Sequence, residues 1–201
     1  MNVRIKWLRN QLMSLNLDGM IVSNPINVRY LTGLSEEGIL IIAPKENIFV
    51  TDGRYIESVN RNLTIDDEIV AYEAKNLNKY DYEAIFMLSE NVGFEENYVT
   101  YEQYKKYLQT YQVNLVETEG LIENQRIVKD EQEIEIITKA CEITDKAFEY
   151  IIKNIRKGMT EKEVALEIEM YFKTHGADGV SFNPIVATRR KFINTTLDSI
   201  W

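Results

Sequence analysis

The sequence predicts an α/β domain, built as a mixed sheet with helices on both faces, followed by the incomplete start of an α+β domain. Apolar runs of strand length alternate with amphipathic helical segments from residue 1 to about 118, which is the pattern of a sheet covered by helices. From about residue 120 onward, two longer helical segments and one apolar run follow. Hydrophobic residues make up 45% and charged residues 27% of the 201 residues, a composition typical of folded globular proteins.

The first half opens with a helix and then a strand. Apolar side chains recur at helical spacing in the first segment, at Ile5, Leu8, Leu12 and Leu15. Gly19 is expected to end this helix, because glycine readily takes the left-handed conformation found after helix C-termini. The apolar run at 20–22 predicts a short strand. The run at 39–43 does not alternate with polar residues, which predicts a strand buried on both faces.

The remaining elements of the first half follow from the same patterns. A turn at 44–47 returns the chain into a strand, and Thr100 with Gln103 forms a capping-box pattern at a helix start. In order, the sequence predicts a strand at 48–50, a helix at 53–60, a strand at 69–72, a helix at 79–88, a strand at 92–94, a helix at 100–107 and a strand at 113–116.

The second half begins with two predicted helices, at 131–155 and 161–175. Their starts are placed by two capping pairs, Asp130 with Glu133 and Thr160 with Glu163. A strand is expected at 180–187. Two helices and one strand enclose little core by themselves, so we expect their apolar faces to be exposed and to favour self-association.

Charge and cysteine content argue against several classes of protein. The net charge of −9 argues against a nucleic-acid-binding or anionic-membrane surface. No apolar run approaches the ~18 residues that span a bilayer, and charged residues stand where a signal peptide has its apolar core. The single cysteine, Cys141, excludes an intrachain disulfide, so we expect a cytoplasmic protein. Because Cys141 lies on an apolar helix stripe, we expect a buried, unreactive thiol.

Three groups of residues are more specific than these patterns. The first is NVRYLTG at 27–33, and the second is TDGRY at 51–55. The third is spread over the second half, as RIVKD at 126–130, EI at 133–134, KA at 139–140, GMTE at 158–161, GADGVSF at 176–182 and IVAT at 185–188. In this order and spacing they resemble the family of Xaa-Pro aminopeptidases and Xaa-Pro dipeptidases (prolidases), whose fold is shared with creatinase. The resemblance covers residues 1 to 188.

The resemblance implies a creatinase/prolidase-like N-terminal domain at 1–120 and the first helices and strand of a pita-bread peptidase domain at 121–188. In this family the pita-bread domain holds two divalent metal ions, often manganese, cobalt or zinc, bound by two Asp, one His and two Glu. The ions activate a water that attacks the bond before a proline in Xaa-Pro peptides. Family members usually form homodimers, in which the N-terminal domain helps to shape the mouth of a neighbouring active site.

Four residues in the first two motifs are candidates for substrate binding in a complete enzyme. Arg29 and Tyr30 belong to the first motif, and Asp52 and Arg54 to the second. A structural role is an alternative for each pair. The segment containing Arg29 and Tyr30 is compatible with a helical turn capped by Gly33, and Asp52 is placed to cap a helix while Arg54 pairs with a nearby acid.

No catalytic or metal-binding residue is assigned in this chain. The family's metal ligands follow the IVAT strand, and residues 189–201 contain one carboxylate, Asp198, and no histidine. The only histidine, His175, is expected to be a surface residue at a helix C-terminus. The tail at 189–201 also diverges from the family pattern. A shifted reading frame of residues 189–197 can spell EENSLIPH, so our hypothesis is that the tail is a frameshift product, which the nucleotide sequence tests.

Two functions are compatible with these residues. The first is the N-terminal portion of a metal-dependent Xaa-Pro peptidase, of aminopeptidase or dipeptidase type, that is inactive alone because it lacks the metal ligands. The second is a non-catalytic module of the same fold that binds a peptide or a protein. Such a module is expected to cover its apolar faces, by completing its fold or by pairing with a partner.

Overall fold

The computed structural model describes residues 2–63 and 68–187, and the chain divides after Val128 into two compact units. The change of pattern in the sequence suggests a boundary at residue 120. The first unit extends further because helix α6 (Leu121–Ile127) buries Ile122 completely in its core. The predicted divergent tail at 189–201 lies outside the described residues. Among the described residues, no helix has the length and apolar character that crossing a bilayer requires.

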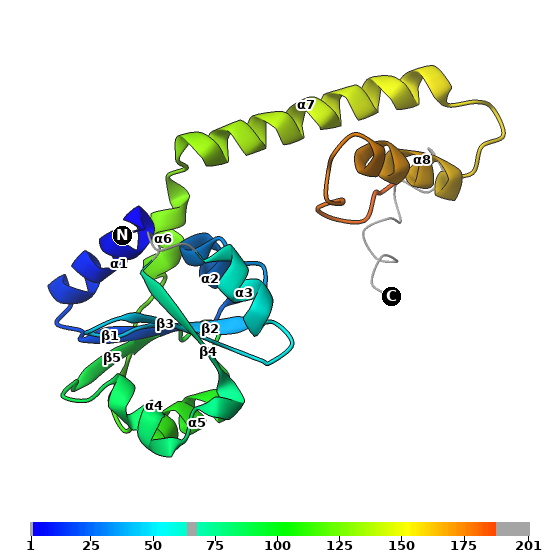
Figure 1. Cartoon of the computed structure of the whole chain (residues 1–201). Helices are drawn as coiled ribbons and strands as arrows, with labels where there is room; N and C mark the ends of the chain where they lie inside the picture. Colours follow the sequence, from blue (N-terminus) through cyan, green and yellow to red (C-terminus); the bar gives the residue numbers. More distant parts are fainter. Residues whose placement is uncertain (1, 64–67, 188–201) are drawn as a thin grey trace. The chain divides into compact units, whose positions relative to one another are not determined.

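Within the described residues, the first unit contains one six-stranded sheet. Its strands are β1 (Gly19–Val22), β2 (Gly38–Ile42), β3 (Asn47–Thr51), β4 (Ile69–Glu73), β5 (Asn91–Phe94) and β6 (Asn114–Glu117). They lie in the order β4-β3-β2-β1-β5-β6 (Figure 1). β2 runs antiparallel to β1 and to β3, whereas the other neighbours are parallel. The predicted mixed sheet is confirmed.

Helices cover both faces of this sheet (Figure 1). One face carries α1 (Val3–Ser14), α2 (Pro25–Thr32), α3 (Ile56–Asn62) and α6. The other face carries α4 (Lys79–Ile85) and α5 (Tyr101–Tyr111), with the short helical turn η2 (Ala74–Asn76) before α4. The capping box predicted at the start of α5 is present, because the Thr100 and Gln103 side chains each bind the other residue's backbone N–H.

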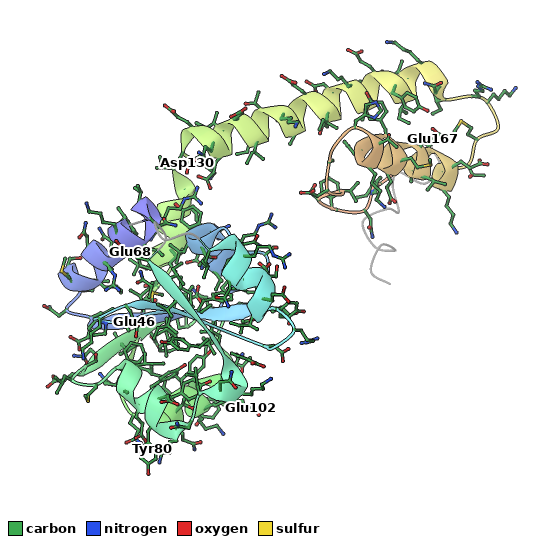
Figure 2. All side chains as sticks on the ribbon, in the orientation of Figure 1. Glu46, Glu68, Tyr80, Glu102, Asp130 and Glu167 are labelled. Carbon is green, nitrogen blue, oxygen red and sulfur yellow. The ribbon has the colours of Figure 1, made fainter. Side chains whose placement is uncertain are left out.

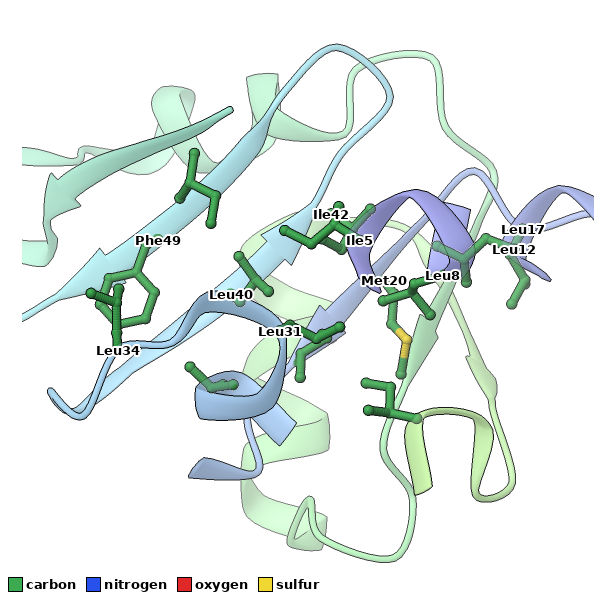
Figure 3. Packing of buried hydrophobic residues seen from close by; sticks show 14 of the residues in the cluster. Ile5, Leu8, Leu12, Leu17, Met20, Leu31, Leu34, Leu40, Ile42 and Phe49 are labelled. Atoms are coloured by element: carbon green, nitrogen blue, oxygen red, sulfur yellow. The ribbon is translucent and has the colours of Figure 1, made fainter. Parts of the chain in front are cut away.

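The core consists of two clusters, one on each side of the sheet. Figure 3 shows the first cluster, in which Ile5 and Leu8 of α1 and Leu31 of α2 pack with Leu40 and Phe49. In β2, Leu40 and Ile42 face this cluster and Ile41 faces the second one, and all three are fully buried. The strand predicted from the non-alternating run at 39–43 is therefore buried on both faces at these positions, as expected.

The role predicted for Gly19 is wrong. Helix α1 ends at Ser14, and its last turn is followed by Asn16, which has a left-handed φ of 54°. Gly19 instead opens β1, where a Cβ atom would lie 2.3 Å from the carbonyl oxygen of Ile42. A side chain cannot be accommodated there, so close packing of two strands explains this glycine. Leu15, also predicted on the buried face, is 52% exposed.

The second unit contains the two predicted helices, α7 (Glu131–Asn154) and α8 (Glu161–Thr174). Both begin with a complete capping box, Asp130 with Glu133 and Thr160 with Glu163. Their apolar side chains are largely exposed, as predicted from the small number of elements. The exposed set comprises Ile134, Ile136, Ile137, Phe148, Ile152, Leu166 and Met170.

Two predictions for the second unit are wrong. Residues 180–187 form no strand, because a strand requires a neighbour for its backbone hydrogen bonds and the described part of this unit contains no other strand. Cys141 is exposed rather than buried, because the apolar stripe of α7 on which it lies is itself largely exposed.

We predict that Phe49→Ala lowers the free energy of unfolding of the first unit by about 3–5 kcal/mol, since it leaves a cavity in the core. Phe49 has no exposed surface. The matched control is Met13→Ala on α1, where 68% of the residue is exposed, and it should change stability by less than ~0.5 kcal/mol. Urea unfolding of both variants measures the difference. Equal losses would show that the first cluster does not stabilise the unit as described.

Candidate functional site

The first and third sequence motifs meet at one buried asparagine. Asn27 lies in the first turn of α2, a helix that begins at Pro25 and is capped by Asn24. Asn27 is fully buried. Its Oδ1 accepts a hydrogen bond of 2.9 Å from Nη1 of Arg126, which belongs to the RIVKD motif on α6. The two motifs, separated by 99 residues in the chain, are therefore joined side chain to side chain.

Two carboxylates complete this polar cluster. The Asn27 Nδ2 group donates to Oε1 of Glu95 at 2.7 Å and to Oε1 of Glu123 at 2.6 Å. Oε2 of Glu95 accepts the backbone N–H groups of Ser23 at 2.6 Å and Asn24 at 2.7 Å. Burial raises the pKa of the Glu95 carboxyl, while the hydrogen bonds from Asn24, Asn27 and Ser23 oppose this shift by favouring the ionised form.

This cluster holds α2 in place. Glu95 directly follows β5, so its carboxylate ties the end of that strand to the loop that leads into α2. Arg126 and Glu123 add α6 to the same point. The sequence analysis missed Glu95. The available signal was its place, an acidic residue at the carboxyl end of a parallel strand, which is where polar sites gather in α/β sheets.

Arg29 and Tyr30 point to different surroundings although they are adjacent in sequence. Arg29 is exposed and lines a surface hollow of about 570 Å³ with Pro25, Ile26 and Tyr98. Within the described residues, its guanidinium makes no ion pair or hydrogen bond. Tyr30 is half-buried, and the guanidinium carbon of Arg4 lies 4.1 Å from its ring centre. Tyr30 therefore packs α2 against α1, and Arg29 alone of this pair faces the hollow.

Asp52 and Arg54 form a tight turn after β3. Oδ1 of Asp52 accepts the Arg54 backbone N–H at 2.9 Å and its Nε–H at 2.8 Å. These hydrogen bonds, the backbone one first, lower the pKa of the Asp52 carboxyl. Asp52 does not cap α3, whose N-cap is Tyr55. Arg54 pairs with a nearby acid, Asp52, as the structural alternative predicted.

The four predicted residues do not converge on a single hollow. Arg29 lines the hollow beside α2, whereas Asp52 lines a second hollow on the α4–α5 face of the sheet. Glu37 and Gly38, at the start of β2, line both. In the Arg29 hollow, an arginine that makes no ion pair with a described residue lies beside apolar and acidic side chains. Asp52 and Arg54 form a separate turn in which they neutralise each other.

The described residues contain no group of three or more His, Cys, Asp or Glu side chains arranged to hold a metal ion. His175 is the C-cap of α8, is exposed, and stacks on Tyr171 with ring centres 3.8 Å apart. Its Nδ1 lies 2.8 Å from the Tyr171 carbonyl oxygen. The surface role predicted for His175 is confirmed. A pair of divalent ions does not fit the side chains of the described residues.

The family profile described as Creatinase/Prolidase N-terminal domain matches residues 4–128, which is essentially the whole first unit. The chain belongs to the creatinase/prolidase family. A second profile, metallopeptidase family M24, matches residues 135–192. The creatinase/prolidase N-terminal domain is thus followed in the same chain by residues of a metallopeptidase family whose complete members use divalent metal ions.

Known relatives of this creatinase/prolidase chain are peptidases. An uncharacterized peptidase of Bacillus subtilis is 32% identical over 188 residues, which cover 92% of this chain and 53% of that protein. The Xaa-Pro dipeptidase of Pyrococcus furiosus is 30% identical, with 86% of this chain and 49% of that protein covered. The solved Xaa-Pro dipeptidase from Bacillus anthracis matches with a TM-score of 0.78 and 31% identity, covering 89% of this chain and 50% of that one.

The chain spans about half the length of the curated relatives it matches. The similarity runs through both units, because the matches cover far more than the creatinase/prolidase N-terminal domain alone. The predicted family and fold class are confirmed by these matches.

We predict that Asn27 and Arg126 are energetically coupled. In a double-mutant cycle of Asn27→Ala and Arg126→Ala, the coupling free energy of unfolding should reach ~1 kcal/mol or more. The reason is that removing either side chain leaves the other with an unmet hydrogen bond. The control cycle is Glu57→Ala with Arg61→Ala, an exposed ion pair of 2.9 Å on α3, for which ~0.5 kcal/mol or less is expected. Similar values in the two cycles would contradict the assigned link between the motifs.

Proposed function

We propose that these residues are the N-terminal half of a metal-dependent Xaa-Pro peptidase, of aminopeptidase or dipeptidase type. The observation that carries this proposal is the order of two family regions in one chain, the Creatinase/Prolidase N-terminal domain at 4–128 and metallopeptidase family M24 at 135–192. Two relatives of this chain, from Pyrococcus furiosus and Pyrococcus horikoshii, are Xaa-Pro dipeptidases and are each 30% identical to it. The substrate is accordingly a peptide with proline in its second position.

Within such an enzyme, we assign the first unit to peptide positioning. Arg29 supplies an uncommitted cation for a carboxylate or carbonyl oxygen of the peptide, and the neighbouring Pro25, Ile26 and Tyr98 supply apolar surface for a proline ring. The buried cluster around Asn27 holds the helix that carries Arg29. Tyr30 supports the same helix through its contact with Arg4. Asp52 and Arg54 shape the neighbouring turn.

Hydrolysis is assigned to no residue of this chain. Peptidases of family M24 use divalent metal ions, and the described residues contain no cluster that fits them. We therefore propose that the 201-residue chain is inactive by itself. A cytoplasmic location is part of the same proposal, supported by the single cysteine.

We predict that the 201-residue chain does not cleave a Xaa-Pro peptide in the presence of Mn²⁺, because two metal ions are needed to activate the attacking water. A chimera should be active, in which residues 1–187 replace the matching half of the Bacillus anthracis Xaa-Pro dipeptidase. EDTA should abolish that activity. In the chimera, Arg29→Ala should raise KM about 10-fold with little change in kcat, as loss of a ground-state contact does, whereas exposed Arg61→Ala should change neither.

Different results of this assay would contradict different parts of the proposal. Turnover by the 201-residue chain that survives repeated purification would contradict the inactivity proposal. A chimera that melts cooperatively and binds Mn²⁺ but does not cleave Xaa-Pro peptides would contradict the assignment of this half to a Xaa-Pro peptidase. The Pyrococcus furiosus Xaa-Pro dipeptidase is the positive control for the assay.

We further propose that the chain self-associates through the second unit. Phe148 is 69% exposed and Ile152 is 60% exposed, and both lie on α7 one turn apart. Exposed apolar side chains at helical spacing lose water-accessible surface when a second apolar helix packs on them. A homodimer is the smallest assembly that covers this stripe.

We predict that sedimentation velocity of the 201-residue chain shows a concentration-dependent shift to larger species. Phe148→Ser should weaken this association by about 10-fold to 100-fold, because roughly 1.5–3 kcal/mol of apolar burial is lost on the side chain. Glu149→Ser on the adjacent, exposed position is the matched control and should leave association unchanged. A monodisperse monomer that resists protease throughout the second unit would instead favour a self-contained binding module.

A further inference from the structure

A second hollow lies on the face of the first unit that α4 and α5 cover. Its volume is about 630 Å³, within the range of pockets that hold small organic molecules. Its apolar part is formed by Ile39 of β2, Val50 of β3 and the rings of Tyr82 and Tyr111. The two tyrosine rings meet edge to face, with centres 5.9 Å apart. The hollow thus continues the second core cluster outward as an apolar, aromatic surface.

Tyr111 brings a hydrogen-bond donor to the wall of this hollow. The residue is 5% exposed, yet its hydroxyl makes no hydrogen bond to any described residue. The hydroxyl oxygen is not one of the solvent-inaccessible side-chain atoms that lack a partner, so it can donate a hydrogen bond to a molecule held in the hollow. Burial raises the pKa of the Tyr111 phenol, so this hydroxyl stays protonated and remains a hydrogen-bond donor at neutral pH.

The rim of the hollow also carries lysine side chains, whose positive charge suits a negatively charged ligand. Lys106 of α5 lines the hollow and makes no ion pair with a described residue. Lys79 also lines it, although its Nζ lies 3.5 Å from Glu83. Of the two acids on the strand side of the rim, Asp52 is paired with Arg54 at 2.8 Å. Glu37 makes no ion pair of its own with a described residue, although its charge acts on Arg54 from a distance.

We propose that this hollow is a binding site for a small carboxylate with an apolar or aromatic body. The body packs on Ile39, Val50 and the tyrosine rings, and the carboxylate accepts hydrogen bonds from the Tyr111 hydroxyl and from Lys106. A ligand that also carries an ammonium group gains a partner in Glu37. Glu37 and Gly38 also line the Arg29 hollow, whereas Tyr111 and Lys106 line only this one. Binding here does not depend on peptide hydrolysis.

The test is calorimetric titration of the 201-residue chain with three probes that share one body: 3-phenylpropanoate, its neutral amide and 3-phenylpropylamine. The carboxylate should bind about 10-fold more tightly than the amide, as a hydrogen bond to a charged group does relative to a neutral one. The amine should bind least tightly. Phenylalanine, which adds an ammonium group to the same body and carboxylate, shows whether Glu37 contributes.

Two substitutions with matched controls locate the site. Tyr111→Phe should weaken binding of 3-phenylpropanoate about 10-fold, whereas Tyr80→Phe should not, since Tyr80 lies on α4 with 79% of its surface exposed (Figure 2). Lys106→Gln should weaken binding and neighbouring Lys105→Gln should not, because Lys105 lies over the Tyr101 ring instead. Tyr111→Phe should also leave the melting temperature unchanged, since the hydroxyl makes no hydrogen bond to a described residue whose loss would destabilise the fold.

Equal binding of the carboxylate and the amide would overturn the proposal, as would equal effects of Tyr111→Phe and Tyr80→Phe. A Tyr111→Phe variant that unfolds or melts at a clearly lower temperature would also overturn it, because the hydroxyl would then serve the fold. Loss of binding with a maintained melting temperature would establish the hydroxyl as a ligand contact.

Discussion

The first unit depends on the burial of β1 on both of its faces. β1 lies inside the sheet, where it pairs antiparallel with β2 and parallel with β5. Met20 and Val22 face one core cluster and Ile21 faces the other, with at most 1% of each exposed. Helices are needed on both sides to keep this strand from water, which requires the two-layer covering seen in Figure 1. Gly19 follows from the same constraint, because the neighbouring strand leaves no space for a side chain.

The second unit lacks an equivalent constraint. α7 and α8 have strong local start signals, yet Ala147 and Val164 are the buried residues assigned to these helices. Local capping defines where a helix begins but contributes only ~1 kcal/mol, whereas tertiary burial supplies most of the stability of a helix in a protein. The first unit therefore has the burial needed for independent stability.

The sequence predicted the features that local interactions determine. The capping boxes at Thr100, Asp130 and Thr160 and the buried run at 39–43 all lie where the pattern placed them. Features set by residues distant in the chain were not predictable in this way. A strand at 180–187 requires a neighbouring strand, and the exposure of Cys141 depends on what packs on α7. The link between Asn27 and Arg126 spans 99 residues, so the separate motifs gave no sign of their contact.

Native-state hydrogen exchange of the 201-residue chain, at a concentration where it is monomeric, tests the contrast between the two units most directly. The backbone amides of β1, β2 and β3 should exchange only through global unfolding, and those of α7 and α8 through openings that cost far less free energy. Equal protection of α7 and the central strands in the monomer would contradict the account, because it would mean that the second unit possesses a stabilising core of its own.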